Sequence, residues 1–258
     1  MNARTHGQVK VVGAGLIGTS IGLALQKLQV DVAIEDVSPA NQMLAIDYGA
    51  GRAVSSEDSP NLIIVCVPPD VTAAVVAREL EAHPEAFVTD VASVKSAILE
   101  QLRQNGSDLS RYVGSHPMAG RERGGAASGR ADLFFGRVWV VVPSETSSAK
   151  ARQAVENLAL DLSSAPVEAS AAEHDRAVAF VSHVPQLISS ITAASLIDAS
   201  DEDIALAGQG VRDTTRIAAS NPKLWLQILS ANAPEVLAVL RNVQNDLGAV
   251  MQALENPE

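Results

Sequence analysis

The sequence predicts an α/β fold in which a doubly wound parallel sheet is followed by a smaller, all-helical domain. Three observations support this prediction. Short β-branched runs alternate with amphipathic stretches in roughly the first two thirds of the chain, a glycine-rich turn separates the first run from the first helix, and little strand pattern follows residue 170. We therefore expect two domains, at residues 1–168 and 169–258.

Five runs are expected to form strands, because they are apolar and rich in β-branched residues. Their near-absence of polar alternation is typical of strands that are buried on both faces of a parallel sheet. The runs cover residues 9–12, 30–36, 62–67, 87–91 and 138–142.

Helices are expected between these strands, because several intervening segments begin with a capping residue. A Ser or Asp side chain before a helix accepts a hydrogen bond from a backbone N–H group that has no partner inside the helix. The candidate caps are Asp70 before residues 71–82, Ser93 before 94–104, and Ser147 or Ser148 before 149–162.

The C-terminal domain is expected to be helical throughout. Residues 171–198 are predicted to form one long helix, Asn221-Pro222 begins another with a cap and a proline, and Asn232 is expected to cap the last. The last helix carries a heptad-like seam of apolar residues, namely Val236, Leu240, Val243, Leu247, Val250 and Leu254.

Two interpretations of this seam are open. It belongs either to an ordinary core helix or to an interface between two copies of the chain. We expect a homodimer that pairs through the C-terminal helices, because the helical domain is too small to complete a deep pocket alone.

Composition limits the class of partner. A formal net charge of −11 on 258 residues argues against nucleic acid or an anionic membrane as a partner. The single cysteine, Cys66, lies in an apolar run and is expected to be a buried thiol; no metal-ligand spacing is present, so no metal is expected. The clearest apolar runs are too short to cross a bilayer, and the first residues lack the apolar stretch of a secretion signal, so we expect a cytoplasmic protein.

The segment Gly13-Ala14-Gly15-Leu16-Ile17-Gly18 has the pattern of a Rossmann-type dinucleotide-binding turn. Gly13 permits the tight turn, Gly15 lets the backbone approach a pyrophosphate, and Gly18 lets the helix pack on the strand. The N–H groups at the start of the helix, at Leu16 and Ile17, are expected to bind the phosphates.

The second strand ends at Asp36, 18 residues after Gly18. A carboxylate there can accept hydrogen bonds from the adenosine ribose hydroxyls and would repel a 2′-phosphate, so we expect NAD rather than NADP. Glu35 as the ribose ligand, or Asp36 as a solvated turn residue, are the alternatives. Val67, at the end of the third strand, is expected near the adenosine half of the cofactor.

Residues 114–120 place His116 between glycines, with a proline directly after it. These residue types are unfavourable in a helix or a central strand. We therefore expect a loop that holds the imidazole beside a ligand.

Several segments, in this order, resemble prephenate and arogenate dehydrogenases. They are residues 13–18, 90–95, 114–120 and 210–218, together with Ser182-His183-Val184-Pro185. The resemblance covers nearly the whole chain. It implies an NAD-dependent oxidative decarboxylation of prephenate to 4-hydroxyphenylpyruvate in tyrosine biosynthesis, or the corresponding reaction of arogenate, which gives tyrosine directly.

The resemblance also implies site residues. His116 would accept the proton of the substrate hydroxyl, which suits a neutral imidazole, and Ser93 would orient His116. A pure helix-capping role for Ser93 is the alternative. Arg216 is the expected anchor of a substrate carboxylate, because its planar fork makes bidentate bonds; a structural ion pair with Asp213 is the alternative.

Three further residues are candidates for the substrate site. His183 lies in an apolar helix, where a histidine is more often a core residue; the resemblance favours substrate contact. Asp213 accompanies Arg216 in the same segment. Glu122 is expected to gate the pocket by pairing with an arginine; solvated surface charge is the alternative for Arg121 and Glu122. The family often has threonine-glutamate where this chain has Arg121-Glu122.

Two rival functions remain at this stage. An NAD-binding regulator without turnover would not need His116, Ser93 and Arg216 together. A β-hydroxyacid dehydrogenase relies on a lysine in its helical domain, and the only lysine after Lys150 here is Lys223, just past Asn221-Pro222.

Overall fold

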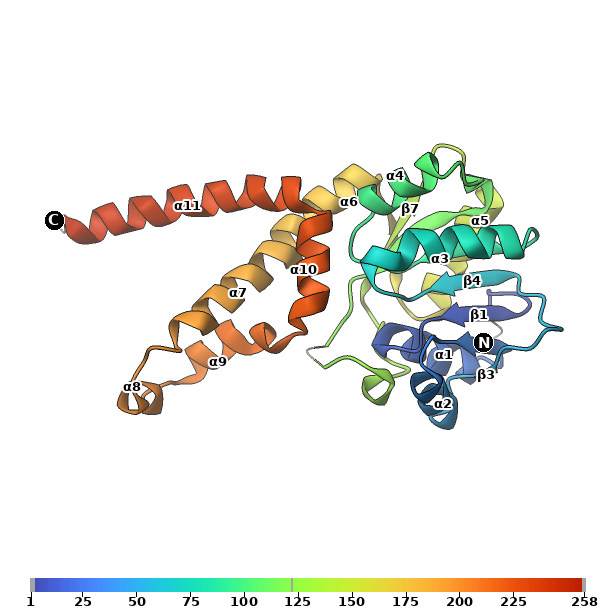
Figure 1. Cartoon of the computed structure of the whole chain (residues 1–258), viewed down its shortest axis with the longest axis horizontal. Coiled ribbons are helices and arrows are strands. Elements are labelled where there is room, and N and C mark those ends of the chain that lie inside the picture. Colours follow the sequence, from blue (N-terminus) through green and yellow to red (C-terminus); the bar gives the residue numbers. More distant parts are fainter. Residues whose placement is uncertain (1–2, 122, 257–258) are drawn as a thin grey trace. The chain divides into compact units, whose positions relative to one another are not determined.

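A computed structural model describes residues 3–121 and 123–256 of the chain (Figure 1). It contains two compact units, residues 1–174 and 175–258. The first is an α/β unit and the second is helical, as the sequence predicts.

The first unit is built on a five-stranded parallel sheet with the order β3-β2-β1-β4-β5. The strands are β1 (Val9–Val12), β2 (Val32–Glu35), β3 (Arg52–Ala53), β4 (Leu62–Val65) and β5 (Phe87–Asp90). The helices that follow them are α1 (Leu16–Lys27), α2 (Pro39–Asp47), α3 (Pro69–Ala82) and α4 (Ser96–Gln104).

The strand order reverses direction at β1, because β2 and β3 lie on one side of it and β4 and β5 on the other. Crossovers between parallel strands are right-handed, so this reversal puts α1 and α2 on one face of the sheet and α3 on the other. A crevice forms at such a switch point, outside the carboxyl ends of the two central strands, and it is the usual ligand site of this fold. The fold class predicted from the sequence is confirmed.

Two expectations about strands were wrong. Residues 138–142 do not join the parallel sheet, and residues 114–117 are not a loop. A second sheet has the order β6-β7-β8, in which β6 (Val113–Pro117) pairs antiparallel with β7 (Val138–Pro143), and β8 (Ala165–Glu168) runs parallel to β7.

Strand β6 tolerates its unusual composition because it is at the edge of its sheet and lies beside β5. The Thr89 hydroxyl donates a hydrogen bond to Ser115 Oγ at 3.0 Å, and Ser115 Oγ donates to the Asp90 carbonyl oxygen at 2.9 Å. All three residues are fully buried. Pro117 is the last residue of the strand, where a missing N–H group does not interrupt the ladder.

The predicted caps had mixed outcomes. Ser148 caps α5 (Ala149–Asp161) through a hydrogen bond from the Ala151 N–H group at 3.2 Å, as expected. Asp70 is not a cap but lies in the first turn of α3, which begins at Pro69 because proline is favourable at the first helical position. Helix α4 begins at Ser96 and not at residue 94, so the capping alternative for Ser93 was wrong.

The helical unit begins within a continuous run from residue 171 to residue 195. It consists of α6 (Ala171–Val178), a π-helical turn (Ala179–His183) and α7 (Val184–Ser195). The π-helical turn ends two residues before Pro185, whose missing N–H group prevents the regular hydrogen bond to residue 181. The predicted helix therefore begins at the correct residue, but the observed run ends at residue 195 and not at residue 198. The π-helical turn was not predicted.

By length and composition, the run from residue 171 to residue 195 could cross a membrane. The apolar runs considered in the sequence analysis are shorter and could not. Core helices of water-soluble proteins pass the same test. Ala179 and Val184 of the run belong to the buried core of the helical unit, together with Val236 and Val239. The part of the run around these two residues therefore packs in the core of this unit.

The remaining helices of the unit are α8 (Asp201–Ala205), α9 (Gln209–Thr215), a 3-10 turn (Arg216–Ala219), α10 (Pro222–Ala231) and α11 (Ala233–Glu255). Asn221 caps α10 through hydrogen bonds from the N–H groups of Lys223 and Leu224 at 2.9 and 3.3 Å, as predicted. Asn232 occupies the cap position of α11 as predicted, but its side chain makes no capping hydrogen bond, so the predicted capping interaction was wrong.

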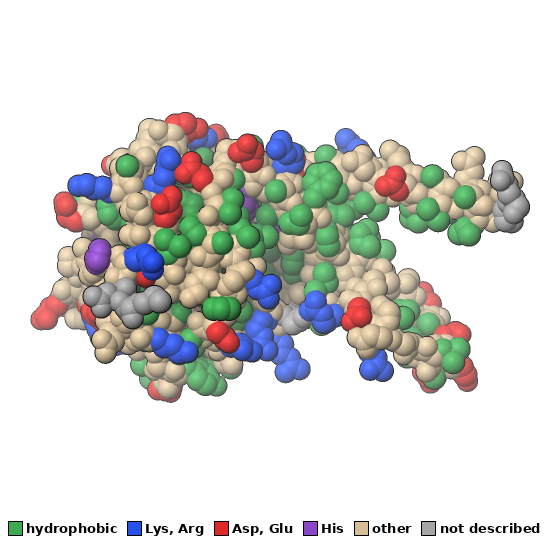
Figure 2. All heavy atoms as spheres, turned by 180° about the vertical axis from the view of Figure 1, so that it is seen from behind, with side chains coloured by type: hydrophobic (Ala, Val, Ile, Leu, Met, Phe, Trp, Pro, Cys, Tyr) green, Lys and Arg blue, Asp and Glu red, His purple; other side chains and the backbone are tan. Residues whose placement is uncertain are grey.

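The seam of α11 is divided into a buried and an exposed part. Val236 is buried, and Leu240 and Val243 pack against the core of the unit. In contrast, Leu247, Val250 and Leu254 are 58%, 55% and 74% exposed. Figure 2 shows apolar side chains along the outer part of this helix.

Candidate active site

The glycine-rich turn has the geometry that a dinucleotide site needs. Gly13 has a φ of +107°, and a Cβ atom there would lie 2.4 Å from the Cys66 carbonyl oxygen. A Cβ atom on Gly18 would lie 1.9 Å from the Gly13 carbonyl oxygen. A Cβ atom on Gly15 would meet no atom of the described chain within 4 Å, so this glycine leaves open space outside the turn.

Helix α1 offers its N-terminus to that open space. Gly15 is the residue before the helix, and no side chain of the described residues caps it. The N–H groups of Leu16 and Ile17 therefore have no partner within the helix. They lie at the positive end of the helix dipole, which also attracts anions. Such a terminus binds phosphate. Val67 lies next to Gly13, which places it at the same crevice.

The carboxylates at the end of β2 have different surroundings. Asp36 Oδ2 accepts a hydrogen bond from the Ala14 N–H group at 2.7 Å, and Oδ1 accepts one from the Ser38 N–H group at 2.8 Å. Asp36 is thus fixed beside the glycine-rich turn, where a ribose ligand is required.

Glu35 contacts cations instead. Its carboxylate oxygens lie 2.8 Å from Lys10 Nζ and 3.0 Å from an Arg78 guanidinium nitrogen. Partial burial opposes ionisation, but the hydrogen bond and charge of Lys10, with Arg78, lower the pKa of Glu35 below its usual value. The geometry favours Asp36 over Glu35 as the ribose ligand.

His116 lies on β6, where it pairs with Val140 of β7, and it is 8% exposed. Its Nδ1 atom lies 2.9 Å from Nε2 of His174, which is 2% exposed. None of the sequence motifs described above includes His174. The two residues are 58 positions apart, so no local pattern could have revealed this contact.

Ser93 lies in the segment between β5 and α4. Asp90 shapes the segment, because its Oδ1 accepts hydrogen bonds from the Ala92 N–H group at 2.9 Å and from Lys95 Nζ. Asp90 Oδ2 accepts a third bond from the Tyr112 hydroxyl at 2.7 Å. Burial, with the nearby charge of Asp90, raises the pKa of Tyr112 well above its usual value. This buried cluster delays the start of α4 and leaves Ser93 in an irregular loop.

His183 is fully buried in the π-helical turn of the second unit. Its Nδ1 atom lies 3.1 Å from Asn232 Nδ2, which also donates a hydrogen bond to the Asp175 carbonyl oxygen at 2.8 Å. An amide NH2 group only donates, so His183 Nδ1 accepts, and a neutral His183 carries its proton on Nε2. Asn232, expected only as a helix cap, instead sets the tautomer of a candidate substrate ligand.

The other predicted residues of the helical unit lie at a helix junction. Arg216 is the first residue of the 3-10 turn that follows α9, and Asp213 lies on α9. Asp213 Oδ1 accepts a hydrogen bond from Gln209 Nε2 at 2.7 Å.

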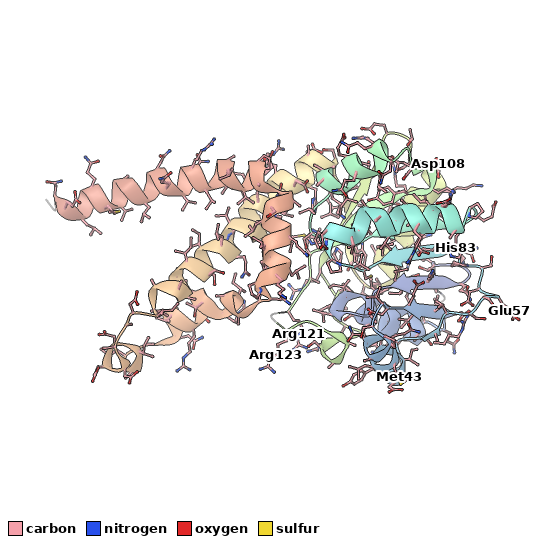
Figure 3. The ribbon with its side chains drawn as sticks, viewed as in Figure 1. Met43, Glu57, His83, Asp108, Arg121 and Arg123 are labelled. Atoms are coloured by element: carbon pink, nitrogen blue, oxygen red, sulfur yellow. The ribbon has the colours of Figure 1, made fainter. Side chains whose placement is uncertain are left out.

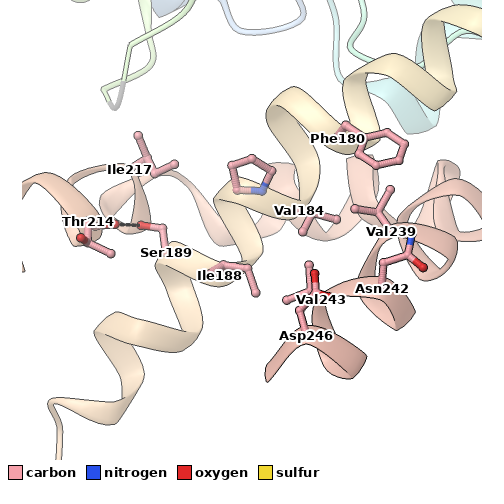
Figure 4. A pocket seen from close by; sticks show the side chains of 11 residues that line it. Phe180, Val184, Ile188, Ser189, Thr214, Ile217, Val239, Asn242, Val243 and Asp246 are labelled. Atoms are coloured by element: carbon pink, nitrogen blue, oxygen red, sulfur yellow. Dashed lines mark hydrogen bonds between the residues drawn. The ribbon is translucent and has the colours of Figure 1, made fainter. Parts of the chain in front are cut away.

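A separate apolar groove of about 570 Å³ runs along the helical unit (Figure 4). Its walls come from the π-helical turn, α7, α9, the 3-10 turn after α9, and α11. Ser189 Oγ of α7 donates a hydrogen bond to the Thr214 carbonyl oxygen of α9 at 2.7 Å. His183 and Arg216 do not line it, although their neighbours Val184 and Ile217 do. Its lining is mainly apolar, including Phe180, Val184, Ile188, Ile217, Val239 and Val243.

The loop after β6 is rich in arginine, with Arg121, Arg123, Arg130 and Arg137 between β6 and β7. Glu122 lies outside the described residues. Arg121 donates a hydrogen bond to the Ser128 carbonyl oxygen at 3.4 Å, and Arg130 forms an ion pair with Asp132 at 2.8 Å. Figure 3 shows Arg121 and Arg123 on this loop.

Comparison with known proteins gives the family. A model described as "Prephenate dehydrogenase, nucleotide-binding domain" matches residues 21–167, and "Prephenate dehydrogenase, dimerization domain" matches residues 170–258. The first match begins after the glycine-rich turn, so the geometry of that turn is an independent observation.

Similar proteins agree. A probable prephenate dehydrogenase, NovF, of Streptomyces niveus is 36% identical over 95% of this chain and 68% of its own length. The prephenate dehydrogenase of Bacillus subtilis is 31% identical, over 89% of this chain and 65% of its own length.

A solved structure agrees as well. Arogenate dehydrogenase of Synechocystis aligns with a TM-score of 0.78 at 27% identity, covering 96% of this chain and 92% of that one. The two family models together cover nearly all of the residues from 21 to 258, and they meet near the junction of the two structural units. The chain belongs to the prephenate dehydrogenase family.

Proposed function

We propose that this chain is an NAD-dependent prephenate dehydrogenase, an oxidoreductase that converts prephenate to 4-hydroxyphenylpyruvate. The observation that carries the proposal is a buried imidazole, His116, fixed through one ring nitrogen within the unit that also holds a nucleotide-binding turn. Membership of the family supplies the reaction class. The proposed domains are residues 1–168 for the nucleotide and 169–258 for substrate and dimerisation.

The cofactor is NAD. Gly13 and Gly18 form the turn, Gly15 leaves space for a pyrophosphate, and the N–H groups of Leu16 and Ile17 point out of the start of α1. Asp36, fixed beside the turn, suits the ribose hydroxyls and disfavours a 2′-phosphate. Val67 lines the same crevice. When bound, the nicotinamide supplies the acceptor for a hydride.

The proposed reaction removes a hydride and CO2 from prephenate. The hydroxyl proton at C4 of prephenate passes to a base while the C4 hydride leaves, so C4 becomes a carbonyl carbon. The ring carboxylate then leaves as CO2, and its bonding electrons make the ring aromatic. The resulting phenolate regains a proton. The protein must therefore hold the substrate, accept the hydroxyl proton and exclude competing water.

The residues take the following proposed roles. His116 accepts the hydroxyl proton, since a neutral imidazole is a suitable base near neutral pH. Ser93 orients His116 from the loop that Asp90 shapes. Arg216 binds a substrate carboxylate through its planar fork, and His183 donates a hydrogen bond through Nε2. Asp213 and Glu122 complete the proposed substrate site.

Arogenate is the alternative substrate. It differs from prephenate in carrying an amino group in place of the side-chain keto group. The structural likeness to the arogenate dehydrogenase of Synechocystis supports this alternative. Loss of hydride and CO2 is the same in both reactions, so the residue roles do not change.

We propose a cytoplasmic homodimer that assembles through the helical unit. The second family model is described as a dimerization domain, and it covers the whole of α11. Two apolar surfaces of that unit support the same assembly, the exposed end of the seam and the groove beside Val239 and Val243. The groove accepts the apolar helix of a second copy of this chain.

The test is an NADH-production assay with purified protein, prephenate or arogenate, and NAD or NADP. We expect turnover of prephenate with NAD and a clear preference for NAD over NADP. Turnover of arogenate alone would assign the alternative substrate. A preference for NADP would overturn the role of Asp36, and turnover of neither substrate would overturn the proposed function.

A further inference from the structure

Two buried histidines meet end to end in the first unit. His116 Nδ1 and His174 Nε2 are 2.9 Å apart. His116 is 8% exposed and His174 is 2% exposed. The ring centroids are 5.1 Å apart, with the planes inclined at 68°. With the two nitrogens 2.9 Å apart, the centroids can be this far from each other only if both nitrogens lie close to the line between the centroids. The contact is therefore nearly linear, as a strong hydrogen bond requires.

The contact constrains the proton positions of both rings. A neutral imidazole has one N–H donor and one bare acceptor nitrogen. A hydrogen bond between two neutral rings therefore fixes one as donor and the other as acceptor. Two imidazolium ions at this distance are strongly disfavoured, because both nitrogens would then carry protons and two like charges would be buried together.

The backbone around His174 is well fixed. Ser170 and Glu173 form a reciprocal cap at the start of α6, in which Ser170 Oγ accepts from the Glu173 N–H group at 3.2 Å and Glu173 Oε2 accepts from the Ser170 N–H group at 2.9 Å. The His174 N–H group donates to the Ser170 carbonyl oxygen at 2.9 Å. His174 is thus presented to His116 from an ordered first turn of a helix, which suits a residue that positions another.

We propose that His174 is a positioning residue for His116. His116 Nδ1–H donates to His174 Nε2, which keeps the proton of neutral His116 on Nδ1 and leaves Nε2 as the basic nitrogen. This inference rests on the proposed function, in which His116 is the base; Nε2 is then the nitrogen that accepts the proton of the substrate hydroxyl.

The same contact acts after proton transfer. When Nε2 takes the hydroxyl proton, His116 becomes an imidazolium ion, and the neutral acceptor His174 stabilises the N–H group at Nδ1. The arrangement resembles the way in which the aspartate of a Ser-His-Asp triad selects a histidine tautomer. Here the acceptor is uncharged, so we expect a smaller contribution to turnover.

Ring-nitrogen NMR tests the tautomer without any need for activity. The chain has five histidines, so 15N-histidine labelling gives a small set of signals, and the His116 signals are identified by their loss in His116→Asn. In the wild-type protein we expect His116 with a protonated Nδ1 and a bare Nε2. His174→Gln, which keeps an acceptor oxygen near the position of Nε2, is expected to preserve this tautomer, whereas His174→Leu is expected to lose it.

Kinetics with prephenate and NAD form the second part of the test. We expect His174→Leu to lower kcat by about 10- to 100-fold, the effect typical of removing a residue that orients a metal-ligating histidine, with an unchanged Kd for NAD. His174→Gln should retain kcat within a few-fold. The matched control is His83→Gln, the same change at a histidine whose ring pairs with Glu79 and not with His116; we expect no change in tautomer or kcat.

The outcomes separate the two proposals. A wild-type protein that turns over neither substrate, but shows the expected tautomer and its loss in His174→Leu, overturns the function and supports the positioning contact. An active protein in which His174→Leu changes neither the His116 tautomer nor kcat overturns the positioning role. If His174→Gln loses as much activity as His174→Leu while both bind NAD normally, the acceptor explanation is also overturned.

Discussion

Lys95 and Asp90 form a buried ion pair at the start of the loop that carries Ser93. Both side chains are almost completely inaccessible to solvent, and Asp90 also accepts hydrogen bonds from Ala92 and Tyr112. A buried carboxylate with several donors is stable only while those donors remain. The pair therefore sets the course of the chain between β5 and α4.

Lys95→Met tests this pair. We expect the free energy of unfolding to fall by about 3–5 kcal/mol, because the substitution leaves the Asp90 carboxylate buried without its cation. Urea unfolding measures the change. Lys150→Met is the control, since Lys150 is exposed at the start of α5, and it should be nearly neutral. Equal stability of the two variants would contradict the structural role of the pair.

Two glycine substitutions separate folding from cofactor binding. Gly18→Ala puts a Cβ atom 1.9 Å from a backbone oxygen, so we expect a lower Tm. Gly15→Ala meets only open space in the protein, so we expect an unchanged Tm and NAD binding weaker by about tenfold or more, a loss of at least 1.4 kcal/mol. Thermal unfolding and NAD titration distinguish the two. Normal NAD affinity in Gly15→Ala would place the pyrophosphate elsewhere.

His116→Asn tests the base. Turnover of prephenate should fall by roughly 10²–10⁴-fold, the usual size of a general-base contribution, while the Kd for NAD stays the same. The measurements are steady-state kinetics and NAD titration. Retained turnover would show that His116 does not accept the proton.

Arg216→Ala tests the carboxylate anchor. We expect KM for prephenate to rise roughly 10- to 100-fold with a smaller change in kcat, because a charge-assisted bond to a carboxylate largely stabilises the bound ground state. Arg212→Ala, at an exposed arginine on α9 four residues earlier, is the matched control. An unchanged KM in Arg216→Ala would remove Arg216 from the substrate site.

Leu247→Asp tests the dimer interface. Leu247 is 58% exposed on α11, so the change should leave the fold of the single chain intact and weaken association by burying a charge in the interface. Sedimentation at micromolar concentration should show a dimer for the wild type and a shift to monomer for the variant. Asn245→Asp, an exposed polar position on the same helix, is the control. A monomeric wild-type protein would refute the dimer.

The fold class and the residues of the nucleotide turn could be predicted from local sequence patterns. Gly13, Gly15 and Gly18 could be interpreted directly, because a glycine pattern between a strand and a helix reflects a local steric requirement. The strands of the parallel sheet could also be recognised, because a strand that is buried on both faces has apolar residues at nearly every position.

The positions and contacts of the candidate site histidines depend on tertiary packing that local sequence patterns do not predict. Residues 114–117 form a strand and not a loop, because β5 supplies partners for Ser115. His174 meets His116 across 58 positions, and Asn232 meets His183 across 49. These contacts join residues that are distant along the chain, so no local propensity encodes them. They depend on how strands and helices pack, and they fix which nitrogen of each histidine carries the proton.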